Sequence, residues 1–154
     1  WQATAPADLI FSNAALHWLD DHPALFPGLV KSLKPGGWLA AGDWMKSPGS
    51  YSKDMDYFFE MEGLTYHLVT LADYGRHIHE AGFVDVRLTD ITERYRKEAH
   101  EELARMQGEL RGMMLAELGE AGNAHFIEDW RSLTVVLDKG ELRPAQIWAR
   151  KPAA

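Results

Sequence analysis

The chain of 154 residues contains no cysteine, and no apolar run in it approaches the roughly 20 residues of a membrane-spanning helix. The lack of cysteine excludes disulfides and thiolate chemistry, and it suits a cytoplasmic protein. Basic residues are also scarce, since 16 lysines and arginines face 23 aspartates and glutamates, which gives a formal net charge of −7. Nucleic acids and anionic membranes bind basic surfaces, so neither is expected as the main partner.

The sequence also lacks a glycine-rich loop of the form G-x-G-x-x-G, which holds nucleotide cofactors between a strand and a helix. The first residue is Trp1 rather than an initiator methionine. We therefore expect the chain to be part of a longer polypeptide. The composition itself is ordinary, with 46% hydrophobic and 25% charged residues, and it predicts a single domain over residues 1–154.

The first forty residues predict a strand, a helix and a second strand. An apolar run at 9–11 predicts a short strand over residues 8–13 that is covered on both faces. Asp20, Asp21 and Pro23 then open a helix, which the turn Lys34-Pro-Gly-Gly is expected to end.

The second strand, 38–42, is expected to end at Asp43 and Trp44. A strand, a helix and a strand in this order imply a parallel crossover. The carboxyl ends of both strands should therefore meet at one edge, where ligands bind in open α/β sheets.

The remaining pattern predicts a mixture of helices and strands, and hence an α/β fold. Helices are expected at 53–62, 70–82, 93–118 and 124–137, and strands at 83–91 and 145–149. Ser52 is a candidate helix cap, and Thr70 with Asp73 forms a candidate capping box.

These motifs together resemble the second half of a class I S-adenosylmethionine-dependent methyltransferase. The first forty residues are similar to the trans-aconitate methyltransferases, and the stretch from Pro23 to Pro152 is similar to the phosphoethanolamine N-methyltransferases. The matching pieces are Pro23-Ala-Leu-Phe, Leu33-Lys-Pro-Gly-Gly, Asp43-Trp-Met-Lys-Ser-Pro-Gly, Tyr74-Gly, Ala81-Gly-Phe-Val, Gln107-Gly-Glu-Leu, Trp130 and Ile147-Trp-Ala-Arg-Lys.

The resemblance implies the C-terminal half of a Rossmann-like methyltransferase sheet. The strands at 8–13, 38–43, 83–91 and 145–149 would be strands four to seven of that sheet, with the last one antiparallel. The helices at 53–62 and 93–137 would be insertions over the active site. Strands one to three, which carry most of the cofactor site, would be missing, so we expect cofactor binding by this chain alone to be weak or absent.

Without strands one to three, the strand at 8–13 would be an exposed apolar edge. We expect this edge to pair with a missing N-terminal half or with a second copy of the chain, as in a homodimer.

By resemblance, Ser12, Asn13 and Ala14 would contact the methionine part of S-adenosylmethionine, and His17 would be the catalytic base. An imidazole suits proton removal from an ammonium because its pKa lies near the working pH. Two simpler readings stay open, namely an ordinary turn at the strand end and a His-Trp pair that only begins a helix.

Five residues are candidates for binding the methyl acceptor: Asp43, Trp44, Tyr57, Phe58 and Glu62. Asp43 could accept a hydrogen bond from an amine, or it could cap the loop that follows. The aromatic residues could form a wall for a methylated ammonium by cation–π contact, or they could belong to the core.

The resemblance also argues against a phosphobase as the acceptor. The phosphoethanolamine methyltransferases hold the phosphate with tyrosines and an arginine, which belong to an Asp-Tyr pair after the fifth strand and to a Tyr-x-x-x-Arg-x-Tyr series. The matching positions here are Trp44, Phe58, Glu62 and Leu64. A glutamate repels a phosphate dianion, and the bidentate arginine is gone, so we expect a less anionic acceptor that carries no phosphate, either an amine or a hydrophobic molecule.

Three functions therefore remain. The first is methyl transfer to a small amine, and the second is carboxyl O-methylation, which needs no general base. The third is a non-catalytic methyltransferase-like fragment that associates through its open edge. A metal site is not expected, since His77 and His79 are two residues apart on a helix and point in different directions.

Overall fold

The computed structural model describes residues 4–153, which divide into two compact units. Among these residues, unit 1 holds the chain up to Pro48, Tyr66–Ile91 and the chain from Arg143 onward. Unit 2 holds Gly49–Thr65 and Thr92–Leu142. The single domain expected over residues 1–154 stays a prediction, and the two units are described separately.

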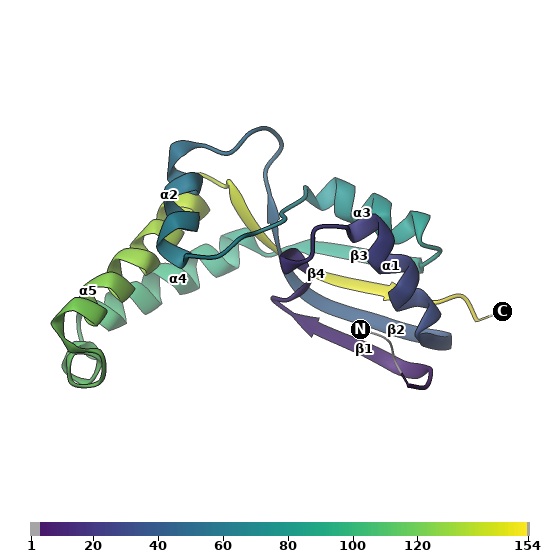
Figure 1. Cartoon of the computed structure of the whole chain (residues 1–154), viewed down its shortest axis with the longest axis horizontal. Helices are drawn as coiled ribbons and strands as arrows, with labels where there is room; N and C mark the ends of the chain where they lie inside the picture. The colour runs from purple at the N-terminus through teal and green to yellow at the C-terminus, as the bar shows by residue number, and fades with distance from the viewer. Residues whose placement is uncertain (1–3, 154) are drawn as a thin grey trace. The chain divides into compact units, whose positions relative to one another are not determined.

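Unit 1 is built on a four-stranded sheet in the order β1-β2-β4-β3 (Figure 1). The strands are β1 at Ala7–Asn13, β2 at Leu33–Lys46, β3 at Val84–Asp90 and β4 at Leu142–Arg150. β1 and β2 pair in parallel, and β4 pairs antiparallel to β3. The predicted parallel pair at the start of the chain and the antiparallel last strand are both confirmed.

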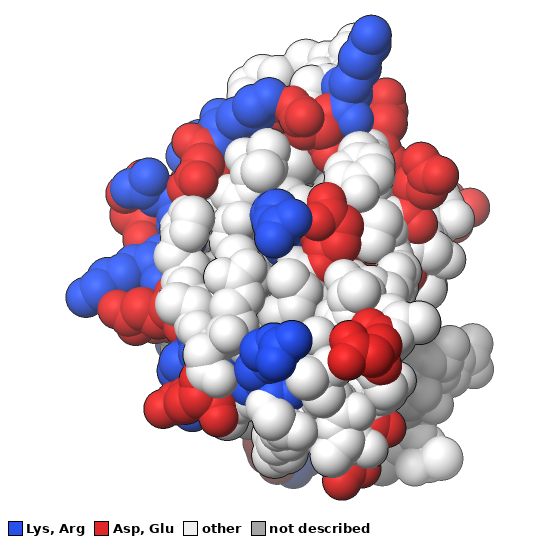
Figure 2. Space-filling view, turned by 90° about the vertical axis from the view of Figure 1, so that its left-hand side faces the viewer, with Lys and Arg blue, Asp and Glu red and all other residues white. Residues whose placement is uncertain are grey.

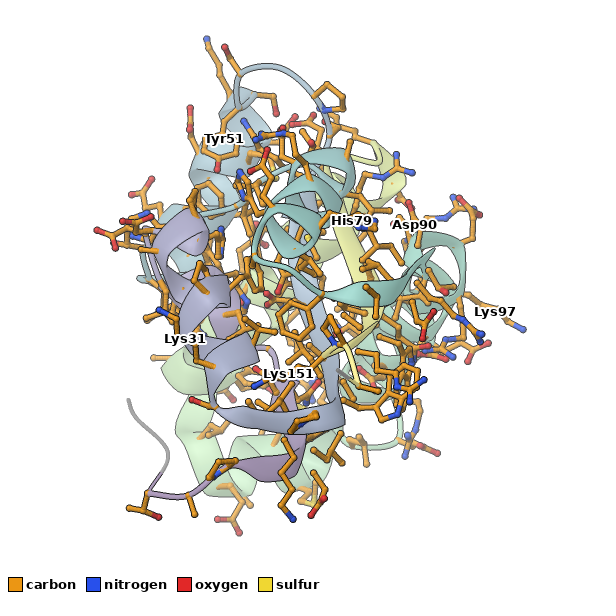
Figure 3. All side chains as sticks on the ribbon, turned by 90° about the vertical axis from the view of Figure 1, so that its right-hand side faces the viewer. Lys31, Tyr51, His79, Asp90, Lys97 and Lys151 are labelled. Atoms are coloured by element: carbon orange, nitrogen blue, oxygen red, sulfur yellow. The ribbon has the colours of Figure 1, made fainter. Side chains whose placement is uncertain are left out.

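Three helical segments complete unit 1: the 3₁₀ turn η1 at Leu16–Trp18, α1 at His22–Lys31 and α3 at Leu71–Glu80. Thr70 begins α3 as the capping-box pattern predicted, because its hydroxyl accepts a hydrogen bond from the backbone N–H of Asp73. Lys31 near the end of α1 and His79 in α3 help to locate the two helices in Figure 3.

The stretch 34–37 lies inside β2, so the prediction that it forms a turn ending the first helix is wrong. The helix ends earlier, with Ser32 as its C-cap. Between the pairs Ala7↔Leu33 and Leu9↔Trp38, β1 advances by two residues (7 to 9) and β2 by five (33 to 38), so β2 bulges. Gly36 has φ 77°, which a glycine adopts without strain, and the strand therefore continues through the bulge.

The sheet of unit 1 has a covered face, on which α1 and α3 pack. Phe26 of α1 and Ile78 of α3 are fully buried against Leu39 of β2 and Ile147 of β4. Because side chains of a strand alternate between the two faces, the same alternation turns other large residues away from the helices.

We call the opposite side the bare face, defined by Leu9, Phe11, Trp38 and Trp148. Leu9 is 53% exposed and Phe11 is 71% exposed. β1 is an edge strand of the described sheet, so the prediction of a strand covered on both faces is wrong for this chain. The alternative expectation, an exposed apolar edge, matches the structure.

Unit 2 consists of three helices: α2 at Lys53–Glu62, α4 at Thr92–Gln107 and α5 at Arg111–Asp138. The side chain of Ser52 accepts hydrogen bonds from two backbone N–H groups of α2, which confirms the predicted cap. α4 ends at Gln107 rather than at 118, since the chain reverses at 108–110 and lets α4 and α5 contact each other. The break predicted at 119–123 is a kink at Gly119, whose φ is 70°.

Charged side chains of α4 and α5 form ion pairs along their own helices, such as Arg94 with Glu98 and Arg131 with Glu128. Figure 2 shows basic and acidic side chains interspersed on one face of the molecule. Within residues 4–153, no helix combines the length and the apolar character that crossing a membrane requires.

Candidate active site

β1 ends beside β2, as the sequence predicted, but β2 continues to Lys46, so the prediction that this strand ends at Asp43 and Trp44 is wrong. Ser12 pairs with Ala41 and Asn13 with Gly42 in the parallel ladder. The backbone N–H of Ala14 donates to the carbonyl oxygen of Gly42 over 2.8 Å. This places the three residues expected to contact the cofactor at the edge where β2 reaches Asp43.

The turn that follows β1 is tight and strained. Ala14 has φ 48°, a left-handed conformation that costs a non-glycine residue on the order of 1 kcal/mol. A side chain at Gly42 would place its Cβ 3.1 Å from Oδ1 of Asn13, so the glycine leaves room for this amide. The indole N–H of Trp18 donates to the carbonyl oxygen of Ala14 over 2.9 Å and ties η1 back to the turn.

A buried hydrogen-bond network joins His17, Asp43 and Tyr74. Nδ1 of His17 lies 2.5 Å from Oδ1 of Asp43, and the hydroxyl of Tyr74 donates to Oδ2 of Asp43 over 3.1 Å. The backbone N–H of His17 donates to the same carboxylate over 3.4 Å. The three residues come from η1, β2 and α3, and only 1%, 4% and 0% of their surfaces are exposed.

The network explains how a carboxylate is tolerated in the core. A buried carboxylate is costly unless hydrogen bonds replace its water, and both oxygens of Asp43 accept hydrogen bonds. Burial raises the pKa of the Tyr74 hydroxyl well above its ordinary value, and the negative charge of Asp43 and the hydrogen bond to it add to this effect. The phenol therefore keeps its proton and stays a donor.

The imidazole of His17 packs against two aromatic rings. Its ring centroid lies 4.9 Å from that of Trp18 and 5.2 Å from that of Tyr66, and the Tyr66 ring is stacked on it. Trp18 and Tyr66 also stack on each other at 4.9 Å. The backbone carbonyl of His17 accepts a hydrogen bond from the N–H of His67, which fastens the 66–67 segment beside the imidazole.

The two nitrogens of His17 differ in their surroundings. Nδ1 contacts Asp43, whereas Nε2 is buried and has no hydrogen-bond partner among the described residues. His22, a second buried histidine, instead uses Nε2 to donate to the carbonyl oxygen of Leu16 over 3.0 Å. An unpartnered buried nitrogen is unusual, and it is the arrangement that a proton acceptor needs.

The structure distributes the five candidate acceptor-binding residues between the two units. Asp43 and Trp44 are consecutive in β2, so their side chains project to opposite faces of the sheet. Tyr57, Phe58 and Glu62 lie on α2 in unit 2. The aromatic wall expected from Trp44, Tyr57 and Phe58 stays a prediction.

Within unit 2, the three residues of α2 have different surroundings. The hydroxyl of Tyr57 donates to Glu128 over 3.1 Å, and this bond raises the pKa of Tyr57. Phe58 is buried in the helical core. The charge of Glu62 helps to raise the pKa of Tyr95, after the larger effects of burial and of two glutamates on α4.

Three aromatic residues near His17 were not among the sequence candidates: Trp18, Tyr66 and Tyr74. Tyr74 belongs to one of the matching motifs, but no spacing rule connects it with Asp43, which lies 31 residues earlier. Tyr66 lies in the irregular segment before α3 and has no periodic pattern around it. Among residues 4–153, no three histidine, aspartate or glutamate side chains are grouped so that they could hold a metal ion.

Comparison with known proteins identifies the fold. A family model described as a methyltransferase domain matches residues 3–41. The solved structure of Haemonchus contortus phosphoethanolamine N-methyltransferase 2, in complex with phosphomonomethylethanolamine and S-adenosylhomocysteine, superposes with a TM-score of 0.85 at 21% identity. The match covers 94% of this chain and 33% of that one. The fold is thus that of the Rossmann-like S-adenosylmethionine-dependent methyltransferases, as the sequence predicted.

The sequence of the chain is also similar to those of two curated methyltransferases. The chain is 31% identical to wheat (Triticum aestivum) phosphoethanolamine N-methyltransferase over 136 residues, which cover 88% of this chain and 26% of that protein. It is 55% identical to trans-aconitate 2-methyltransferase of Azoarcus sp. over 40 residues, 26% of this chain and 16% of that protein. The chain therefore spans about a quarter or less of the length of these relatives.

Proposed function

We propose that the chain is the acceptor-side half of an enzyme that transfers a methyl group from S-adenosylmethionine to a small amine without a phosphate. The observation that carries this proposal is the buried His17–Asp43 pair beside the carboxyl end of β1, where β1 pairs with β2. The methyltransferase fold and the similarity to methyltransferases support it.

The cofactor supplies an activated methyl group on a sulfonium, and the chain's own residues position the acceptor and take up its proton. The acceptor nitrogen forms the new bond to the methyl carbon as the sulfur–carbon bond breaks, which leaves S-adenosylhomocysteine. Such a displacement depends mainly on alignment of the reacting atoms. Nε2 of His17 accepts the proton that the amine loses.

The side chains of Ser12 and Asn13 are the donors that we propose for the methionine part of the cofactor, since the backbone N–H of Ala14 already donates to Gly42. Ser12, Asn13 and the backbone of Ala14 lie at the strand end, but the sequence contains no glycine-rich loop for the remaining parts. We propose that tight binding needs a preceding N-terminal half, or a second copy of the chain, in addition to these residues. A cytoplasmic location is proposed on the lack of cysteine.

Calorimetric titration with S-adenosylhomocysteine tests the cofactor part of the proposal. We expect weak binding to this chain alone, and its loss on substitution of Asn13 by aspartate, which places a negative charge beside the cofactor carboxylate. Asp8→Asn, at the opposite end of β1, is the matched control. Binding that is equally strong in all three proteins would contradict the assignment of this edge.

The acceptor is proposed to lack a phosphate because of the charge at position 62. Glu62 is half-buried on α2, and it stands at the position that matches the phosphate-binding arginine of the phosphoethanolamine methyltransferases. Methyl-transfer assays with a panel of small primary and secondary amines, and with phosphoethanolamine in parallel, test this choice. Methylation of phosphoethanolamine in preference to every free amine would refute it.

Carboxyl O-methylation is the second candidate, and the 55% identity of the opening 40 residues to a trans-aconitate 2-methyltransferase favours it. A carboxylate is already deprotonated, so the reaction needs no general base. His17→Ala discriminates between the two, since we expect amine methylation to fall by about 100-fold or more and carboxylate methylation to persist. A non-catalytic role remains as the third candidate, supported if no methyl acceptor is found and the chain associates through β1.

A further inference from the structure

We propose that Asp43 and Tyr74 are positioning residues, which hold His17 in the tautomer with the proton on Nδ1 and the lone pair on Nε2. This inference rests on the proposed function, since it assigns the device that prepares the proposed base. It also gives Asp43 a different task from the one predicted from the sequence. Asp43 orients the base and does not bind the acceptor.

The hydrogen-bond donors around Asp43 determine which nitrogen of His17 carries the proton. The backbone N–H of His17 and the hydroxyl of Tyr74 both donate to the Asp43 carboxylate. An ionised carboxylate can only accept hydrogen bonds, so the 2.5 Å contact with Nδ1 requires a proton on that nitrogen. A neutral imidazole with its proton on Nδ1 leaves Nε2 as the acceptor.

The carboxylate of Asp43 is held in a fixed position by Tyr74 and His17. Tyr74 is fully buried on α3, and its ring packs against Phe26 at 5.1 Å and His22 at 5.5 Å between centroids. Its hydroxyl reaches Oδ2 of Asp43, while Nδ1 of His17 lies at Oδ1. The two oxygens are thus held from different elements, which prevents the carboxylate from turning away from His17.

The imidazole of His17 is enclosed by side chains from several elements of unit 1. Asp43 of β2, Trp18 of η1 and Tyr66 of the segment before α3 contact it, and Tyr74 of α3 contacts it through Asp43. The ring of Tyr66, which is stacked on the imidazole, and the tilted ring of Trp18 restrict rotation of the imidazole. With Nδ1 committed to Asp43, Nε2 is the nitrogen left for chemistry, and it has no partner among the described residues.

Histidine tautomers can be measured on the chain itself, without cofactor or acceptor. The experiment is ¹⁵N–¹H correlation spectroscopy of histidine-labelled protein at pH 8, with the His17 signals assigned by their absence in His17→Gln. We expect His17 to show a protonated Nδ1 and an unprotonated Nε2, with a slowly exchanging Nδ1 proton. A proton found on Nε2 of the neutral ring would overturn the proposal.

Two conservative variants then separate positioning from mere packing. Tyr74→Phe keeps the buried ring, and Asp43→Asn keeps the shape of the carboxylate. We expect a mixture of tautomers and at least tenfold faster exchange of the Nδ1 proton in Tyr74→Phe, and reversed or mixed tautomers in Asp43→Asn. The tautomer of His22, which its hydrogen bond to Leu16 sets, should stay unchanged in Tyr74→Phe, and Tyr95→Phe in unit 2 should change neither histidine.

Identical His17 spectra in the wild type and both variants would overturn the positioning role, whatever the enzyme assays show. Once an acceptor is known, Tyr74→Phe should lower kcat by about tenfold with little change in KM, because an outer partner of a base acts on the chemical step. The titration with S-adenosylhomocysteine and the acceptor panel test the proposed function independently, so the two can fail separately.

Discussion

The two faces of the sheet in unit 1 both carry large apolar residues, yet they differ in what covers them and in the polar groups they hold. On the covered face, α1 and α3 bury Phe26 and Ile78 against the strands, and they enclose the hydrogen-bonded His17–Asp43 pair. On the bare face, Trp38 and Trp148 pack edge to face with ring centroids 6.5 Å apart and stay partly exposed.

The difference between the two faces shows where a reactive side chain can be held in a fixed position. A buried polar group is retained only if its partners are fixed, and fixed partners are also what a proposed base needs. The bare face contains a cavity of about 430 Å³ lined by Leu9, Trp38, Arg87 and Trp148. Among residues 4–153, this face offers apolar surface but no buried hydrogen-bond network like that of Asp43. We therefore expect the covered face to determine stability and reactivity, and the bare face to tolerate change.

The largest expected effect separates the two faces directly. Phe26→Ala should lower the free energy of unfolding by about 3–5 kcal/mol, because it opens a cavity in the core. Phe11→Ser on the bare face should change it by less than about 1 kcal/mol. Urea unfolding followed by circular dichroism measures both, and a similar loss in the two variants would show that the bare face is covered in solution.

The next effect comes from the charge buried on the covered face. Asp43→Ala leaves the Nδ1 proton of His17 and the hydroxyl of Tyr74 without an acceptor, so we expect a loss of about 3 kcal/mol in unfolding free energy. Asp8→Ala is the control, since its ion pair with Lys34 is exposed and should add little. Equal unfolding midpoints for the two variants would disprove the structural role of the network.

Alkaline pH provides a third comparison. The pKa of Tyr74 is raised by burial, by the charge of Asp43 and by their hydrogen bond. In the unfolded chain the phenol has its ordinary pKa, so it loses its proton at a lower pH than in the folded protein. The contribution of Tyr74 to the free energy of unfolding is fully present below about pH 10. It falls as the pH rises above that value, by up to about 1.4 kcal/mol per pH unit, because the unfolded chain loses the phenol proton first. Unfolding free energies measured from pH 8 to 11 should show this decline in the wild type and a smaller one in Tyr74→Phe.

The smallest expected effect concerns the helix that carries Tyr74. Thr70→Ala removes the side-chain cap of α3 and should cost about 1 kcal/mol. Amide hydrogen exchange should become faster in α3, while the amides of β1 and β2 change less. Faster exchange across the whole sheet would mean that the cap supports more than its own helix.

Local signals in the sequence were sufficient for several elements of both units. The caps at Ser52 and Thr70, the helix over 53–62 and the parallel strands at 8–13 and 38–43 follow from short-range patterns, which act through neighbouring backbone groups. The edge shared by Ser12, Asn13 and Asp43 also followed, since parallel strands must deliver their carboxyl ends to the same side.

At two places the structure differs from what the local sequence pattern predicts, because a contact with a distant part of the chain sets the conformation. Lys34-Pro-Gly-Gly has the residues of a turn, but pairing with β1 on either side of it keeps the chain in β2 as a bulge. The long helix expected over 93–118 divides at 108–110, because the packing of α4 on α5 requires the chain to reverse there.

By itself the sequence determined the elements, their order and the edge at which polar residues gather, because hydrophobic spacing and capping act over a few residues. The tertiary structure alone decided which face each strand buries and which partners Asp43 has. The hydrogen bonds from His17 and Tyr74 span 26 and 31 residues of sequence, so only the packing of η1 and α3 against β2 could create them.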